Sequence, residues 1–148
     1  MSKNHTLLVF LFSLFFTLNA SADYIDGQRA YASGDYGVAI LEWTQVAEDG
    51  NARAQYNLGW MHANAKGTVQ DFKEAIKWYT KSAEQGNVNA QYNLGNLYLR
   101  GQGATQNDEL AFSWFIKAAE QGDAPAQCNL GRMYILGKGD DKNFLEAR

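Results

Sequence analysis

Apolar side chains recur at helical spacing along most of the chain. One row consists of Ala54, Leu58, Met61 and Ala65, and a second consists of Ala75, Tyr79 and Ala83. Spacings of three and four residues place each row on one side of an α-helix. Both rows return 36 residues later in the chain. The pattern therefore predicts pairs of amphipathic helices that repeat.

The repetition extends to identical residues. The segments NARAQYNLG, NVNAQYNLG and DAPAQCNLG begin at Asn51, Asn87 and Asp123. A fixed period of about 20 to 50 residues is typical of a solenoid, in which each unit buries its apolar side against its neighbours. We therefore predict an all-α solenoid of helix-turn-helix units. Its expected divisions are a degenerate N-terminal repeat at 23–50, repeats at 51–86 and 87–122, and an incomplete repeat at 123–148.

Glycine and capping residues divide the units into helices. Glycines suited to a left-handed C-terminus stand at Gly50, Gly86 and Gly122, and N-cap side chains follow at Asn51, Asn87 and Asp123. Turns inside the units are marked by Gly67, Gly103 and Gly139. The expected helices cover 24–33, 36–48, 52–65, 71–85, 88–100, 107–121 and 124–136, with a last stub from about 141.

Two features of the repeat need a further explanation. The glycines inside the first helices are Gly59, Gly95 and Gly131. Glycine in a helix costs up to about 1 kcal/mol relative to alanine, so we expect another helix to pass close to them. Ala65 stands where the next units have Gly101 and Gly137. We expect that turn to be less tightly wound.

The first 22 residues have the pattern of a cleavable export signal. Lys3 precedes a largely apolar run of 12 residues from Leu7 to Leu18, and Ala20-Ser21-Ala22 follows. A membrane-spanning helix needs about 20 apolar residues, so the short run favours cleavage over a membrane anchor. We expect cleavage after Ala22, a periplasmic or secreted mature chain, and no stable membrane insertion afterwards.

The charge of the chain argues against nucleic acid as a partner. The whole chain has 13 basic and 16 acidic residues, and Lys3 would leave with the signal peptide. Binding to a phosphate backbone needs several Lys or Arg side chains acting together, and the sequence has no basic cluster. Nucleic acid is therefore not the expected partner.

Single reactive side chains do not form a recognisable catalytic or metal-binding motif. His62 occupies the position of Tyr98 and Tyr134 in later units, and Cys128 occupies that of Tyr56 and Tyr92. Neither has a partner at the spacing of a metal site or of a nucleophile with its base. We expect packing roles for both, with Cys128 as a small core residue, and no catalytic, metal or cofactor site.

The motif AQYNLGNLYLRGQG (Ala90 to Gly103), followed by Ala111, Trp114 and KAAEQG (Lys117 to Gly122), resembles the Sel-1-like repeat family. This family is related to the tetratricopeptide repeats. The resemblance implies an α/α solenoid that serves as a scaffold for protein recognition. Some cysteine-rich secreted relatives bind or hydrolyse β-lactams, but this chain lacks their paired cysteines and an S-x-x-K motif.

The sequence leaves three functions open. The favoured one is a non-enzymatic scaffold that binds a protein or peptide. The alternatives are a cell-envelope enzyme such as a weak β-lactam hydrolase, and a self-assembling structural unit. The last is suggested by 143–148, which begins a second helix but stops before its Trp and KAAEQG portion. Such an incomplete repeat is expected either in a fragment or where a partner or second copy covers it.

A recurring polar set lies off the apolar rows. The candidate peptide-binding residues are Asn57, Trp60, Asn93, Asn96, Arg100, Asn129 and Arg132. If first helices line the inner surface, these side chains form a ladder that can hydrogen-bond the backbone of an extended peptide. In the alternative interpretation, the asparagines bridge adjacent repeats, since buried amides usually satisfy neighbouring backbone.

Overall fold

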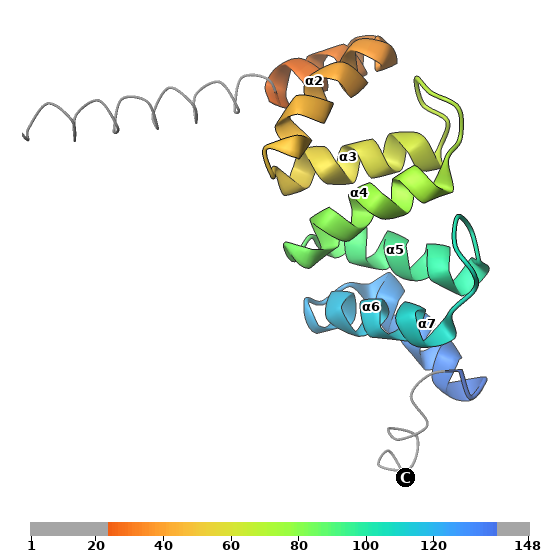
Figure 1. Cartoon of the computed structure of the whole chain (residues 1–148). Coiled ribbons are helices and arrows are strands. Elements are labelled where there is room, and N and C mark those ends of the chain that lie inside the picture. The colour runs from red at the N-terminus through yellow and green to blue at the C-terminus, as the bar shows by residue number, and fades with distance from the viewer. Residues whose placement is uncertain (1–23, 139–148) are drawn as a thin grey trace, which may run out of the picture.

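A computed structural model describes residues 24–138 of the chain. The described part is helical, with no strand between 24 and 138. A helix over 24–33 is followed by α2 (Tyr36–Glu48), α3 (Ala52–Ala63), α4 (Phe72–Glu84), α5 (Val88–Arg100), α6 (Asp108–Glu120) and α7 (Ala124–Ile135) (Figure 1). The all-α solenoid is confirmed. The predicted signal peptide, Gly139 and the stub from about 141 lie outside the described residues.

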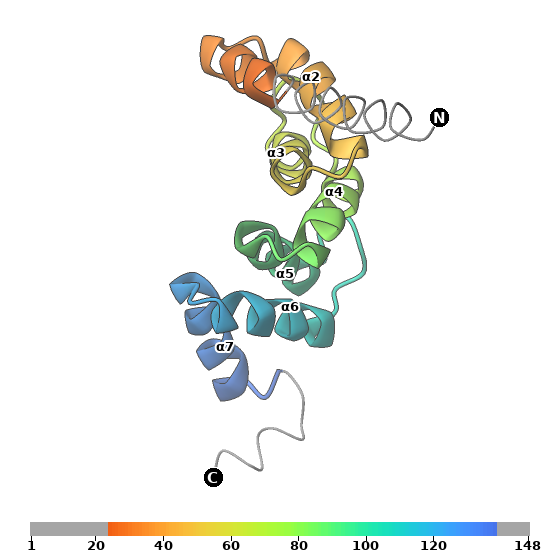
Figure 2. The same cartoon turned by 90° about the vertical axis from the view of Figure 1, so that its left-hand side faces the viewer.

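The helices stack one after another along a single axis. Each of α3 to α6 packs mainly against the helices before and after it in the chain. Figure 2 shows that the row curves, with α3 and α5 nearer its inner side and α4 nearer its outer side. The first helices of the units thus face the inside of the curve, as the expected ladder requires.

The capping residues act as the sequence predicts. The Asn51 side chain accepts hydrogen bonds from the backbone N–H groups of Arg53 and Ala54, and Asp123 accepts one from Ala126. These bonds satisfy donors that the helix itself leaves free. The helices at 24–33, 36–48 and 88–100 have the expected bounds, and the others differ by one or two residues, most clearly α3, which ends at Ala63.

The glycines inside α3 and α5 face aromatic rings of the following second helix. A Cβ atom on Gly59 would lie 2.6 Å from Cδ1 of Tyr79, and one on Gly95 would lie 2.7 Å from Cε1 of Phe115. The expected close approach is therefore confirmed at these two positions. At Gly131 a Cβ atom would meet nothing within 4 Å among residues 24–138, and the expected stub from about 141, which would follow α7, lies outside them.

Buried glutamines connect each unit to the next. Nε2 of Gln91 donates to the carbonyl oxygen of Ala83, and the Gln91 side-chain oxygen accepts from Gln121 30 residues further on. Gln55 makes the equivalent bonds one unit earlier, with Ala47 and Gln85. Because a buried amide without partners would be costly, these paired bonds fix the register between units.

The expectation of a looser turn at Ala65 was wrong. Ala65 adopts φ 54°, close to the φ of 64° and 63° at Gly101 and Gly137. The backbone N–H of Lys66 donates to the carbonyl oxygen of Met61 at 2.9 Å, as Gln102 does to Leu97 at 3.0 Å. Closing hydrogen bonds and packing of the turn thus hold an alanine in a left-handed conformation.

Replacing Ala65 with glycine should therefore stabilise the chain. A left-handed conformation costs an L-residue roughly 1–2 kcal/mol, and the greater flexibility of glycine in the unfolded chain offsets part of the gain. We expect the free energy of unfolding to rise by about 0.5–1 kcal/mol in urea denaturation. Gly101→Ala is the matched control and should change stability in the opposite direction. Destabilisation by Ala65→Gly would contradict this account.

Candidate functional site

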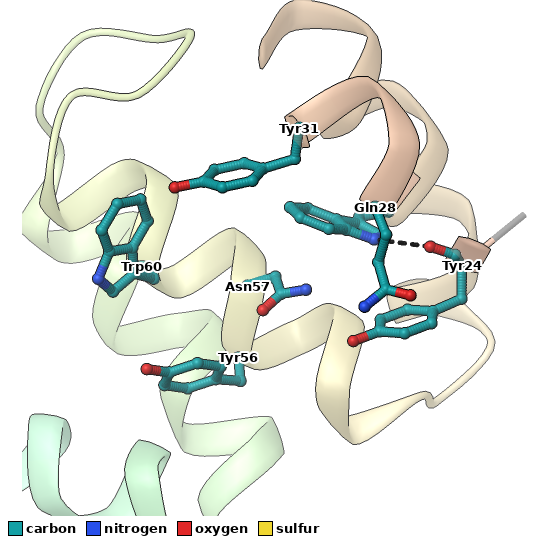
Figure 3. A pocket seen from close by; sticks show the side chains of 7 residues that line it. Tyr24, Gln28, Tyr31, Tyr56, Asn57 and Trp60 are labelled. Carbon is teal, nitrogen blue, oxygen red and sulfur yellow. Dashed lines mark hydrogen bonds between the residues drawn. The ribbon is translucent and has the colours of Figure 1, made fainter. Parts of the chain in front are cut away.

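An aromatic groove of about 330 Å³ opens at the N-terminal end of the stack. Its lining residues are Tyr24, Gln28, Tyr31, Trp43, Tyr56, Asn57 and Trp60 (Figure 3). They come from the helix over 24–33, from α2 and from α3. We refer to this feature as the aromatic groove.

Trp43 forms the base of the aromatic groove and is almost fully buried. Its Nε1 donates a hydrogen bond of 3.2 Å to the backbone carbonyl oxygen of Tyr24. A Cβ atom on Gly27 would lie 2.5 Å from the Trp43 ring, so only glycine lets the helix over 24–33 approach this closely. Trp43 takes the place that Tyr79 has in the next unit. The helix over 24–33 packs on the Trp43 ring through Gly27 and through this hydrogen bond.

The walls of the groove are rings that contact one another. Tyr31 lies 5.7 Å from Trp43 and 6.0 Å from Trp60 between ring centroids, the second pair edge to face. Aromatic pairs in these arrangements add about 0.5–1.5 kcal/mol beyond their buried area. The rings are thus held in place before any ligand binds.

The three repeated asparagines have different surroundings. Asn57 lines the groove, and within 24–138 no hydrogen bond joins its side-chain amide to another residue. Nδ2 of Asn93 donates to the Tyr79 hydroxyl at 3.3 Å, so Asn93 bridges α4 and α5. Asn129 is half-buried on α7. The surroundings differ because the residue 14 positions before each asparagine differs. Asn93 follows Tyr79, which offers a hydroxyl, whereas the equivalent residues before Asn57 and Asn129 are Trp43 and Phe115.

The remaining candidates do not gather at one site. Trp60 lines the groove, whereas Nδ2 of Asn96 donates to the backbone carbonyl oxygen of Tyr92 on its own helix. Arg100 and Arg132 are exposed, and neither pairs with an acidic side chain in the described part of the chain. Of the candidate set, only Asn57 and Trp60 therefore share the groove.

Sequence reasoning missed five residues of the groove: Tyr24, Gln28, Tyr31, Trp43 and Tyr56. Three of them lie before residue 36, where no matching segment exists for comparison. A usable signal was the density of aromatic residues at the start of the mature chain, where Tyr24, Tyr31, Tyr36 and Trp43 lie within 20 residues.

Two phenols, the half-buried Tyr56 and the buried Tyr79, lie close to Asn93. Burial raises the pKa of Tyr56, and a hydrogen bond with Asn93 partly opposes this shift. Burial also raises the pKa of Tyr79 strongly, with a further increase from the neighbouring Tyr56 and a small opposing effect of Asn93. Folding thus favours the neutral form of both phenols.

Tyr79→Phe should reduce the loss of stability at alkaline pH. A folded-state pKa above the unfolded value of about 10 contributes stability that is present below pH 10 and lost as the pH rises further. The variant should lose about 0.5–1.5 kcal/mol near pH 8, where it lacks one hydrogen bond, and fall less steeply above pH 10. Urea denaturation at pH 8 and pH 11 measures both. Equal alkaline losses in the two chains would contradict the assigned role of Tyr79.

His62 and Cys128 lie in different surroundings. Nδ1 of His62 is buried without a hydrogen-bond partner in the described structure. The expectation that Cys128 is a core residue was wrong, because its side chain is exposed. Tyr56 and Tyr92, which hold its position in earlier units, pack on Tyr79 and Phe115, and no such ring covers Cys128 among the described residues.

Two other features of residues 24–138 bear on function. They contain no group of three or more His, Cys, Asp or Glu side chains arranged to hold a metal ion. Their helices are also too short or too polar to cross a membrane.

Comparison with known proteins identifies relatives of this fold. The family model of the Sel1 repeat matches residues 52–87, 88–123 and 124–148. A Sel1 repeat protein from Oxalobacter formigenes is 34% identical with a TM-score of 0.75, over 81% of this chain and 51% of that one. A protective antigen of uropathogenic Escherichia coli with an SLR fold is 35% identical with a TM-score of 0.76, over 80% of this chain and 26% of its own.

A more distant structure shares the fold alone. Cysteine rich protein B of Helicobacter pylori is 23% identical with a TM-score of 0.58, over 62% of this chain and 68% of that one. No curated protein matches the chain. This chain spans about half the length of the Oxalobacter protein and about a quarter of the Escherichia coli antigen. The three matched repeats extend over more than half of the chain, and it therefore belongs to the Sel1 repeat family.

Proposed function

We propose that this chain is a non-enzymatic scaffold of the periplasm or extracellular space that binds a peptide segment of another protein on its inner surface. Proteins of the Sel1 repeat family are typically scaffolds for protein interactions. The observation that supports a peptide site here is the aromatic groove beside Asn57.

The chemistry of the groove suits a peptide. Its tyrosine and tryptophan rings offer a large apolar contact area with few rotatable bonds, which is why these residues dominate the energetics of interfaces. The Asn57 amide has both a donor and an acceptor available for a peptide backbone. Rings that already contact one another need little ordering on binding, so less of the interaction energy is lost.

The residues of the predicted ladder have different roles in the proposed binding surface. Asn57 and Trp60 are direct contacts in this proposal, while Asn93 holds the Tyr56 and Tyr79 phenols in place. Arg100 and Arg132 are exposed further along the stack and can pair with acidic residues beyond the segment in the groove. In this proposal Asn57 binds the peptide, as the ladder interpretation expects, and Asn93 bridges adjacent repeats, as the alternative expects.

Selection of peptides from a random displayed library on the mature chain, 23–148, tests the proposal. Selected peptides should bind in calorimetry. Asn57→Ala should weaken binding about two- to tenfold and Tyr24→Ala about tenfold or more, while the melting temperature changes little in both variants. Lys73→Ala, on the exposed side of α4, is the control and should bind normally. Unchanged affinity in both groove variants, or a loss in the Lys73 variant, would reject the groove as the binding site.

The proposed location has a separate test. When the whole chain is expressed in a bacterium with an outer membrane, the processed protein should be recovered from the periplasm or medium. N-terminal sequencing should then begin at Asp23. A cytoplasmic product that retains Met1 or Ser2 would reject export while leaving the peptide site untouched.

A further inference from the structure

No charged side chain lines the aromatic groove. Five lining residues are aromatic and two, Gln28 and Asn57, are primary amides. A charged ligand group placed there would lose water without gaining an ionic partner, and such desolvation is costly. The part of a ligand that enters the groove is therefore uncharged.

The groove also favours a ligand that is already rigid. Tyr31 contacts both Trp43 and Trp60, and the Trp43 indole is fixed by its hydrogen bond to the Tyr24 backbone. A flexible ligand loses conformational entropy when it is ordered on binding, and this loss offsets the free energy gained from rigid groove walls. A polyproline II segment loses less entropy, because it is already extended before it binds. It has no internal hydrogen bonds, so its backbone groups are free to pair with the groove.

The polar groups of the groove complement a proline backbone. Tyrosine hydroxyls and the amides of Gln28 and Asn57 can all donate hydrogen bonds. Figure 3 shows the Gln28 and Asn57 side chains among the labelled rings. A proline residue has a carbonyl acceptor but no N–H donor, so donors alone satisfy it.

Other common modes of peptide recognition fit less well. Addition of a strand requires an exposed sheet edge, and the described residues contain no strand. An α-helix about 10 Å across needs a continuous apolar groove along its side, whereas the lining of this groove includes the amides of Gln28 and Asn57. Aromatic-lined grooves bind proline-rich segments in several unrelated folds.

We infer that the aromatic groove binds an uncharged, proline-rich segment in the polyproline II conformation. Pyrrolidine rings pack on Tyr31 and Trp60, and backbone carbonyl oxygens accept hydrogen bonds from Asn57 and Gln28. This inference rests on the proposed function and specifies the chemistry of its partner.

Titration of the mature chain with a decaproline peptide, followed by NMR of the tryptophan indole N–H groups, tests the inference. Decaproline should shift the Trp60 resonance in a saturable way and leave that of Trp114 on α6 in place. A ten-residue alanine–serine peptide, uncharged but flexible, should bind at least tenfold more weakly. Asn57→Ala and Gln28→Ala should each weaken decaproline binding about two- to tenfold, the effect of one hydrogen bond. Gln45→Ala, exposed on α2, is the matched control.

The outcomes separate this inference from the proposed function. Equal binding of the two peptides, or no shift of Trp60 with decaproline, would overturn the inference. If library peptides without proline bind in the groove, the proposed function stands and only its partner class is wrong. If neither set of peptides binds, and an oligomer of N-acetylglucosamine shifts the same resonances, both proposals fail and the groove binds a glycan.

Discussion

Replacing Gly103 with alanine should lower the free energy of unfolding by about 2–5 kcal/mol. Gly103 has φ 79°, and a Cβ atom there would lie 2.5 Å from the backbone carbonyl carbon of Phe72 and 2.6 Å from its oxygen. The left-handed conformation costs alanine about 1–2 kcal/mol, and overpacking against the backbone adds about 1–3 kcal/mol. Urea denaturation followed by circular dichroism measures the change.

Gly122→Ala is the matched control for Gly103→Ala. Gly122 has φ 87°, but a Cβ atom there would meet nothing within 4 Å. It should therefore lose only the conformational part, about 1–2 kcal/mol. Similar losses at the two positions would show that the contact between the Gly103 turn and the start of α4 contributes little.

The contacts of this turn explain why glycine recurs at a fixed position in the sequence and predicts the repeat. Gly67 approaches the backbone of Tyr36 as Gly103 approaches Phe72, so both described turns pack on the first residue of the preceding second helix. Because these contacts involve backbone atoms, they admit only glycine at the two positions. Positions fixed in this way, together with the caps at Asn51 and Asp123, predict the helices and their order.

The groove could not be predicted in this way. Tyr24 and Tyr31 have no equivalents in the repeats, so periodicity gives no information on their neighbours. Their location depends on Trp43, which stands where later units have Tyr79 and Phe115, and on Gly27, which lets the helix over 24–33 reach the Trp43 ring. The groove is lined by residues that differ from those of the other repeats, so it can be recognised only from the positions of the helices in the structure.

The asparagines show the same limit at a single position. Asn57, Asn93 and Asn129 are identical in sequence, but only Asn93 has a tyrosine hydroxyl opposite it. The residue that decides between binding and bridging lies on another helix, at a position where the units carry Trp43, Tyr79 and Phe115. Identity within the repeat therefore predicts the location of these amides but not their role.

Phe115→Ala should lower the free energy of unfolding by about 3–5 kcal/mol, the usual cost of removing a buried phenyl ring. The Phe115 side chain is fully buried, with its ring 5.9 Å from that of Tyr92 and in contact with Gly95. Helix content at 222 nm during urea denaturation measures the loss. A loss below about 1 kcal/mol would mean that the structure closes around the cavity.

A double-mutant cycle then tests the contact that shapes every unit. In the native chain Gly95→Ala should destabilise by about 1–3 kcal/mol, because its Cβ would lie 2.7 Å from the Phe115 ring. In the Phe115→Ala chain the same change should stabilise by up to about 1 kcal/mol, since alanine is the better helix former. Gly37→Ala on α2, where a Cβ atom would meet nothing within 4 Å among the described residues, should stabilise both chains. Equal effects of Gly95→Ala in the two chains would show that the ring does not select glycine, and the recurrence of glycine inside the first helices would then need another cause.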